Sequence, residues 1–346
     1  MDRAERTAFV FAGGGSLGAI EAGMLRELVA SGVMPDMVVG ASAGAINAAF
    51  FACHPHMDGA ARLEALWRGV RRAEVMPWSW RVMLGMLGRR STHLVDAGGL
   101  QRLLNRHFAQ ARLEAAPLPL HVVATDMQTG AEVVLSTGSI VQAVLASAAI
   151  PGVFPPVRVD GRLLIDGGVA NNTPISTAIR LGATRVVVLP AGFACADRRE
   201  PRSAIEHALN ALSLLVARQL AQDLEHWAGT IPISVVPPLC PLEVSPYDYT
   251  RCGELIDRAA AATAAWLAAD GLAACNVPGA LYPHHHDDGH AGCSADLPRD
   301  AGAVSAAPAG RPGEAGASAA SSPPGRAPAA SPGRTGRGTC AAGPHR

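Results

Sequence analysis

The stretch Val38 to Asn47, with the sequence VVGASAGAIN, decides how the surrounding chain folds. Two β-branched residues lead into a run of small residues, and the Ala-rich segment that follows, Ala45 to Ala52, favours a helix. This order predicts a strand, a sharp turn and a helix. Ser42 lies in the turn, and a serine on a tight strand-to-helix turn, a nucleophile elbow, exposes its hydroxyl for attack. The small residues that such an elbow requires on both sides of the serine are Gly40, Ala41, Ala43 and Gly44.

An ordinary Gly- and Ala-rich turn is the alternative interpretation of these residues, because G-x-S-x-G is short and recurs by chance in long sequences. The choice depends on the rest of the chain. A serine nucleophile needs a proton acceptor and a set of hydrogen-bond donors for the oxyanion that its attack creates.

The overall composition restricts the functions open to the chain. Its 346 residues are 49% apolar, which is ample for a packed core in one large domain or two smaller ones. The formal net charge is zero, so we expect no general attraction to nucleic acid. All 29 basic residues are arginine, and the lack of lysine excludes pyridoxal Schiff-base enzymes, P-loop nucleotide binding and kinase-type phosphate binding.

The seven cysteines are scattered and never form a C-x-x-C pair. This pattern predicts reduced thiols in a cytoplasmic protein rather than a disulfide framework or a zinc site. A membrane-spanning helix needs an apolar run of about eighteen residues, and the sequence contains none of that length. The apolar run Ala8 to Ala12, which follows Arg3 and Arg6, is too short for a signal peptide, and we interpret it as a strand.

A second glycine-rich turn lies near the start of the chain. Thr7 to Ala12 is a β-rich run, the sequence GGGSLG follows it, and apolar residues then recur at helical spacing from Ala19 until Gly32. The glycines satisfy G-x-G-x-x-G, but a dinucleotide site needs an acid at the end of the second strand, and Asp36 precedes that strand. The alternative is an oxyanion hole made by backbone N–H groups at a helix N-terminus. Its candidate residues are Gly13, Gly14, Gly15, Ser16, Leu17 and Gly18.

The order of the two turns predicts how they lie in space. The first strand ends in the glycine loop and the second ends in Ser42. Adjacent parallel strands bring their carboxyl ends to the same edge of a sheet. We therefore expect the backbone donors of the glycine loop to lie beside the Ser42 hydroxyl.

An acidic residue of interest follows a later hairpin. Val157 to Gly168 contains Asp160-Gly161, a pair that favours a type I′ turn, and its second strand ends in Asp166. Only glycines, Gly167 and Gly168, come directly after this aspartate. A simple turn-forming role is the alternative to a catalytic one, because Asp is common in turns.

Strands and helices alternate from residue 7 to residue 275, which indicates an α/β fold with a mostly parallel sheet covered on both faces, a three-layer α/β/α arrangement. Further strands are expected at Leu120 to Thr125, Glu132 to Leu135, Arg185 to Leu189 and Ile231 to Val236, and further helices at Gly99 to Phe108, Ser139 to Ala149, Ile175 to Gly182, Ser203 to Trp227 and Leu255 to Ala274.

Two segments stand apart from this pattern. Val75 to Arg90 combines Trp78 and Trp80 with arginines, and we expect either a helix packed on the core or a lid that contacts a membrane surface. Residues 283–346 contain few large apolar residues, so we predict a disordered, low-complexity tail after a folded domain of residues 1–282. The histidine cluster of the tail, His284 to His290, lacks a preorganised geometry, and we predict no metal site and no cofactor.

The blocks GGGSLG, GASAG and DGG occur in this order, and together they resemble the patatin-like phospholipase family over most of residues 7–275. Ser147 to Val157, with the sequence SAAIPGVFPPV, and Asp126 with Thr129-Gly130 also match. The resemblance implies a patatin-like fold and a lipid acyl hydrolase without cofactor, whose substrate is a phospholipid or related acyl lipid. It also implies Ser42 as nucleophile, Asp166 as its proton acceptor, and backbone amides around Gly14 and Gly15 as oxyanion hole.

One position departs from the family pattern. The glycine loop of the family often carries a basic residue where this chain has Leu17, so that charge would be missing or supplied from elsewhere. Two alternatives therefore stay open: a catalytically degenerate binding or regulatory module, and a Ser-His-Asp α/β-hydrolase that uses His207 or His226. In that second fold, the nucleophile usually comes after several strands, whereas Ser42 follows only the second.

Overall fold

The computed structural model describes residues 5–76, 95–192, 204–227, 229–240, 242 and 244–274. All of them belong to one compact unit of the chain. The predicted interfacial segment beyond Met76, the tail of residues 283–346 and its histidines lie outside the described residues. No helix in the described part of the chain is both long enough and apolar enough to cross a bilayer.

A single sheet of eight strands forms the centre of the described unit, in the order β5-β6-β3-β2-β1-β7-β8, with β4 also paired to β3. The neighbouring strands β3, β2, β1, β7 and β8 are mutually parallel, and β4, β5 and β6 add antiparallel pairs at one side of the sheet. The strands are β1 (Thr7–Phe11), β2 (Met37–Ala41), β3 (Leu120–Asp126), β4 (Glu132–Leu135), β5 (Val157–Val159), β6 (Arg162–Asp166), β7 (Arg185–Leu189) and β8 (Ile233–Val235).

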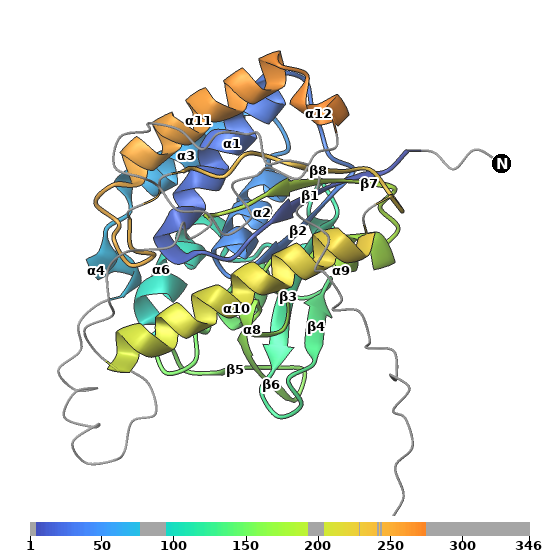
Figure 1. The fold of residues 1–346 in the computed structure, drawn as a ribbon. Helices are drawn as coiled ribbons and strands as arrows, with labels where there is room; N and C mark the ends of the chain where they lie inside the picture. Colours follow the sequence, from blue (N-terminus) through green and yellow to red (C-terminus); the bar gives the residue numbers. More distant parts are fainter. Residues whose placement is uncertain are drawn as a thin grey trace, which may run out of the picture. The chain divides into compact units, whose positions relative to one another are not determined.

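Helices cover both faces of this sheet, as Figure 1 shows, with α10 on the face opposite to α1, α3 and α11. This is the expected three-layer α/β/α arrangement with a mostly parallel sheet. The helices are α1 (Gly18–Ala30), α2 (Ala43–Cys53), α3 (Met57–Gly69), α4 (Arg72–Val75), α6 (Gly98–Phe108), α7 (Ile140–Ser147), α8 (Gly168–Asn171), α9 (Ile175–Arg180), α10 (Ala204–Trp227), α11 (Cys252–Ala268) and α12 (Gly271–Ala274), and the short 3-10 turns are η1 (Gly15–Leu17) and η2 (Leu113–Ala115).

The strands divide their side chains between two hydrophobic cores, because successive residues of a strand point to opposite faces. Phe9 and Phe11 of β1 belong to the larger core, which α1, α2, α3, α6, α7 and α11 cover. Ala8 and Val10 belong to the smaller core, where α9 and α10 pack. The central strands are apolar on both faces for this reason, as their uninterrupted apolar sequences predict.

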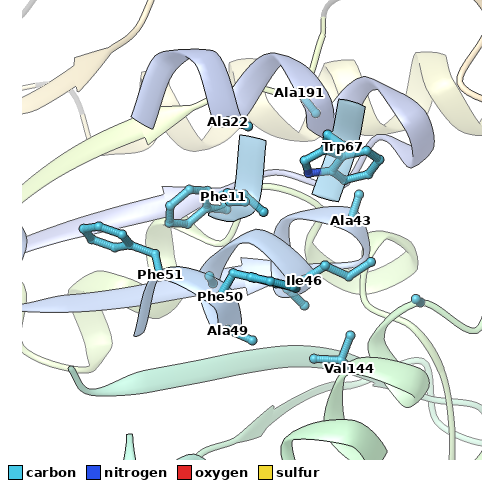
Figure 2. Close-up of a cluster of buried hydrophobic side chains, with 14 of the residues drawn as sticks. Phe11, Ala22, Ala43, Ile46, Ala49, Phe50, Phe51, Trp67, Val144 and Ala191 are labelled. Carbon is cyan, nitrogen blue, oxygen red and sulfur yellow. The ribbon is translucent and has the colours of Figure 1, made fainter. Parts of the chain in front are cut away.

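Helix α2, which begins directly after Ser42, is the most deeply buried helix of the larger core. Figure 2 shows Phe51 beside Phe11 of β1, with Ile46 on the side of the helix toward Val144 of α7. The ring of Phe51 stacks on Phe9, with 6.5 Å between the ring centroids. The helix that carries the elbow is therefore anchored to the sheet by large apolar side chains.

The predicted helix Leu255 to Ala274 is divided in the structure. Helix α11 ends at Ala268, and Asp270 adopts a left-handed backbone conformation with φ +58° before α12 begins. Aspartate tolerates this conformation better than most residues with a side chain. The bend brings Gly271 against Trp266, where an added Cβ would lie 2.0 Å from the indole nitrogen. The helical pattern of the sequence was right, and the turn within it was missed.

Truncation of Phe51 tests whether α2 is anchored as described. Its side chain is fully buried, so Phe51→Ala should lower the free energy of unfolding by about 3–5 kcal/mol, measured by urea denaturation. Met127 is 52% exposed, and the control Met127→Ala should change that free energy by less than about 0.5 kcal/mol. Equal effects of the two variants would contradict the packing of α2.

Candidate active site

Ser42 occupies a strained turn between β2 and α2. Its backbone has φ +53° and ψ −120°, a conformation that is rare for a residue with a side chain. The flanking glycines permit the turn by their small size, since a Cβ on Gly40 would lie 2.4 Å from the Gly44 carbonyl oxygen, and one on Gly44 would lie 2.4 Å from that of Phe11. The end of β1 and the elbow therefore pack backbone against backbone.

The Ser42 hydroxyl donates a hydrogen bond to Asp166, with 2.6 Å between Oγ and Oδ2. Both side chains are almost buried, with exposed fractions of 7% and 6%. The other carboxylate oxygen, Oδ1, accepts the backbone N–H of Gly168 at 2.7 Å. The structure thus brings together the two side chains that the sequence analysis singled out, and both oxygens of the carboxylate have a donor.

Strand pairing explains why these residues meet. Ala41, the last residue of β2, pairs with Val123 of β3, and Asp166, the last residue of β6, pairs with the next residue, Ala124. Strand β4 pairs with residues 122–125 and occupies one edge of β3 there, so β2 and β6 share the other edge. The two strands run toward each other along that edge, and their carboxyl ends converge on Ser42 and Asp166.

Burial changes the acidity of Asp166. Desolvation raises its pKa from 3.8 to about 6, because an ionised carboxylate loses the stabilisation of water. The hydrogen bonds from Ser42 and Gly168 act in the opposite direction and offset part of this effect. A carboxylate with this pKa is mostly ionised at neutral pH and is a better proton acceptor than an exposed aspartate.

Two further polar residues, for which no role was predicted from the sequence, hold this arrangement. The hydroxyl of Ser147 accepts the backbone N–H of Ser42 at 2.8 Å and donates to the Val123 carbonyl at 2.5 Å. The side-chain amide of Asn172 donates to the Gly13 carbonyl at 3.0 Å, and the backbone carbonyl of Asn172 accepts the Gly13 N–H at 3.0 Å. Ser147 was noticed only within the SAAIPG match, and Asn172 follows the DGG motif by four residues. The only sequence signal for either role was a polar residue close to one of the motifs.

Some backbone N–H groups of the glycine loop already donate a hydrogen bond within the protein, and others do not. The N–H of Gly13 is bonded to Asn172, that of Ser16 to the Pro246 carbonyl at 2.8 Å, and those of Leu17 and Gly18 to the loop itself. No acceptor among the described residues is bonded to the amides of Gly14 and Gly15. Of the six candidate residues, these two have N–H groups available to a ligand, and Gly15 lines the same pocket as Ser42.

The same loop is supported from beneath by a buried carboxyl. Glu21 of α1 is fully buried and accepts the Ala12 N–H at 2.7 Å and the Asn47 side-chain amide at 2.7 Å. Asn47 also donates to the Gly18 carbonyl and accepts the Trp67 indole N–H at 2.8 Å. Burial raises the pKa of Glu21 well above its ordinary value and favours its neutral form. The network ties the loop to helices α2 and α3.

Leu17, the position that departs from the family pattern, is a core residue. Its side chain is buried and belongs to the larger hydrophobic core. A Cβ on Gly192 would lie 3.1 Å from its terminal methyl group.

A mostly apolar pocket opens beside the serine. Its empty volume is about 580 Å³, including its open mouth. Among the described residues that line it, all are apolar apart from Gly15, Ser42 and two tyrosines, and the apolar ones come from α2, α3, α4, α6 and the loops next to these helices and after α7. These residues are Ala43, Ile46, Leu66, Trp67, Val70, Val75, Met76, Leu100, Leu103, Ala148, Ile150 and Phe154, and the tyrosines are Tyr247 and Tyr249.

The two histidines considered for a triad lie on α10. His207 and His226 are both exposed, and the His226 ring contacts Trp227 edge-on, with 4.9 Å between the centroids. Neither lines the pocket, and within the described residues no histidine is bonded to Ser42 or Asp166.

Comparison with known proteins identifies a family to which part of this chain is similar. Residues 9–179, which include Ser42 and Asp166, match the family model described as patatin-like phospholipase. An NTE family protein of Mycobacterium tuberculosis is 34% identical over 165 residues, 48% of this chain and 27% of that protein. Patatin-like phospholipase domain-containing protein 7 of Mus musculus is 32% identical over 187 residues, 54% of this chain and 13% of that protein.

The chain thus spans about a quarter or less of the length of these curated relatives. Among solved structures, human GIVD cytosolic phospholipase A2 in complex with methyl gamma-linolenyl fluorophosphonate is 12% identical, with a TM-score of 0.42, over 80% of this chain and 60% of that one. The match of residues 9–179 and these two curated relatives place that part of the chain in the patatin-like phospholipase family.

Proposed function

We propose that this protein hydrolyses carboxylic ester bonds of acyl lipids, phospholipids among them, with Ser42 as nucleophile and Asp166 as base. The observation that carries the proposal is the 2.6 Å hydrogen bond from the Ser42 hydroxyl to the Asp166 carboxylate at the edge of an apolar pocket. The family match gives independent support for a lipid substrate.

The reaction consists of two acyl transfers. Ser42 Oγ attacks the carbonyl carbon of the ester while its proton passes to Asp166 Oδ2, and the free amides of Gly14 and Gly15 bind the oxyanion. The intermediate collapses, the C–O bond to the alcohol breaks, and Asp166 returns the proton to the leaving oxygen. Water then attacks the acyl-enzyme and gives a proton to Asp166. Release of the fatty acid returns that proton to Ser42.

The apolar pocket matches the acyl half of such a substrate. A fatty-acyl chain that moves from water into contact with side chains such as Ile46, Leu103 and Phe154 gains about 0.8 kcal/mol per buried CH₂. No side chain that lines the described part of the pocket carries a charge. Because acyl lipids reside in membranes, we expect a protein that takes them up to bind the membrane surface as a peripheral protein.

Substitution of either member of the pair tests the roles directly. With p-nitrophenyl octanoate as substrate, Ser42→Ala and Asp166→Asn should each lower kcat by about 10³-fold or more, because nucleophile and base act as a unit. Ser31→Ala and Asp58→Asn, at exposed positions, are matched controls and should keep wild-type activity. Full activity of Asp166→Asn together with loss of activity in His207→Ala or His226→Ala would instead support a triad. No activity in any of the proteins would support the degenerate binding module.

The pH profile provides a second test. Asp166 accepts a proton only when ionised, and its pKa is raised to about 6. Activity should therefore be present above pH 6 and lost below it, and kcat/KM should fall about tenfold per pH unit on the acid side. The measurement is kcat/KM between pH 4.5 and 8, with circular dichroism at each pH to verify folding. A profile that stays flat down to pH 5 would contradict the assignment of Asp166 as base.

A further inference from the structure

The segment Ser245 to Tyr249 lies against the glycine loop, although it comes long after the residues 9–179 that match the family. The carbonyl of Pro246 accepts the Ser16 N–H at 2.8 Å, and that of Ser245 accepts the Ser16 hydroxyl at 3.2 Å. A Cβ on Gly15 would lie 2.5 Å from the Pro246 oxygen. The segment is therefore held in a fixed position beside the amides that we assign to the oxyanion.

Two tyrosines of this segment face the pocket. Tyr247 and Tyr249 line it together with Ser42 and Gly15, and both are half-buried. Within the described part of the chain, neither phenol hydroxyl has a hydrogen-bond partner. Burial raises the pKa of both tyrosines, and the negative charge of Asp166 adds to this for Tyr247. Both phenols thus stay protonated and can donate a hydrogen bond.

A phenol hydroxyl that faces an apolar pocket and has no partner in the described part of the protein is available to donate to a ligand, so we expect the ligand of this pocket to supply an acceptor. The acyl chain has no polar atoms and fits the apolar walls. The carbonyl oxygen is directed to the amides of Gly14 and Gly15. The part of the substrate that still carries acceptors is the alcohol half of the ester, with its hydroxyl, ester or phosphate oxygens.

We propose that Tyr247, with Tyr249 beside it, binds the oxygen atoms of a glycerol backbone on the leaving-group side of the scissile ester and selects glycerol esters over simple alkyl esters. This inference rests on the proposed hydrolase function. Glycerol oxygens are shared by acylglycerols and by glycerophospholipids. The specificity of this chain for its alcohol would then reside outside the part that matches the family.

The test compares substrates that share an acyl chain and differ in the alcohol. The value of kcat/KM is measured for 1-octanoylglycerol and for ethyl octanoate with the full chain and with Tyr247→Phe, which removes only the hydroxyl. Loss of one hydrogen bond should lower the ratio of the two values by about three- to tenfold. An unchanged ratio, whether both values fall equally or neither falls, would overturn the proposal. Phe154→Leu, a change in the apolar wall, is the control that should leave the ratio unchanged.

A third substrate distinguishes the two sources of glycerol. With 1-octanoyl-glycero-3-phosphocholine, the Tyr247→Phe variant should show the same relative loss as with 1-octanoylglycerol, since both contain the glycerol oxygens. A loss confined to the phosphocholine ester would assign the hydroxyl to phosphate and would overturn the glycerol assignment.

A binding measurement separates failure of this inference from failure of the proposed function. Calorimetric titration with 1-O-octylglycerol and with ethyl octyl ether, neither of which can be hydrolysed as an ester, reports the subsite without turnover. Wild type should bind the glycerol ether more tightly, and Tyr247→Phe should lose about three- to tenfold of that preference. If wild type prefers the glycerol ether and Tyr247→Phe loses that preference, but the protein has no esterase activity, the proposed hydrolase function is refuted and the glycerol-binding role of Tyr247 stands. Equal binding of both ethers by wild type would overturn the subsite even if hydrolysis is observed.

Discussion

The hydrogen bond between the Ser42 hydroxyl and the Asp166 carboxylate joins residues 124 positions apart in the chain. It exists because β2 and β6 meet end to end along one edge of β3, so that each strand delivers its last residues to the same point. The strained backbone of Ser42 is maintained by rigid surroundings: glycines that allow backbone contact, the Ser147 hydroxyl on its N–H, and a helix anchored by large apolar side chains. Any change in strand register would separate the pair.

Burial makes the carboxylate of this pair more basic. An exposed aspartate is a weak base near neutral pH, and removal from water raises the pKa of Asp166 to about 6, with no cation among the described residues to lower it again. A second buried carboxyl, Glu21, lies under the other end of the glycine loop and is also shifted toward its neutral form. This shift reduces the negative charge near the amides that would bind an oxyanion, while the Glu21 carboxyl holds the loop in place through its hydrogen bond to the Ala12 N–H. Two buried carboxyls thus serve different purposes.

Much of the fold could be predicted because local patterns and tertiary structure agree. The apolar runs of β1, β2, β3 and β7 read as buried strands, Gly32 ends the first helix, and Asp160-Gly161 forms the expected turn with positive φ at both residues. The break at Asp270 was missed because alanine-rich sequence continues across it. The pairing of Ser42 with Asp166 was implied by the resemblance to the patatin-like phospholipase family, whereas their contact depends on strand register, which a single sequence does not contain.

The polar residues that support the site were harder to find. Ser147, Asn172 and Glu21 each lie in a different element, and their roles arise from contacts between segments that are distant in the chain. Tyr247 and Tyr249 carry no motif and reach the pocket only because the loop before α11 returns to the glycine loop. Such residues have no periodicity or spacing that would distinguish them from ordinary loop residues.

The central claim is that Ser42 is a nucleophile activated by Asp166, and covalent labelling tests it most directly. The full chain is treated with an alkyl fluorophosphonate, and tandem mass spectrometry of the tryptic peptide Glu27 to Arg62 locates the adduct. We expect a single adduct on Ser42 that forms at least about 10²-fold more slowly in Asp166→Asn. An adduct on another residue, or equally fast labelling of Ser42 without the carboxylate, would contradict the account.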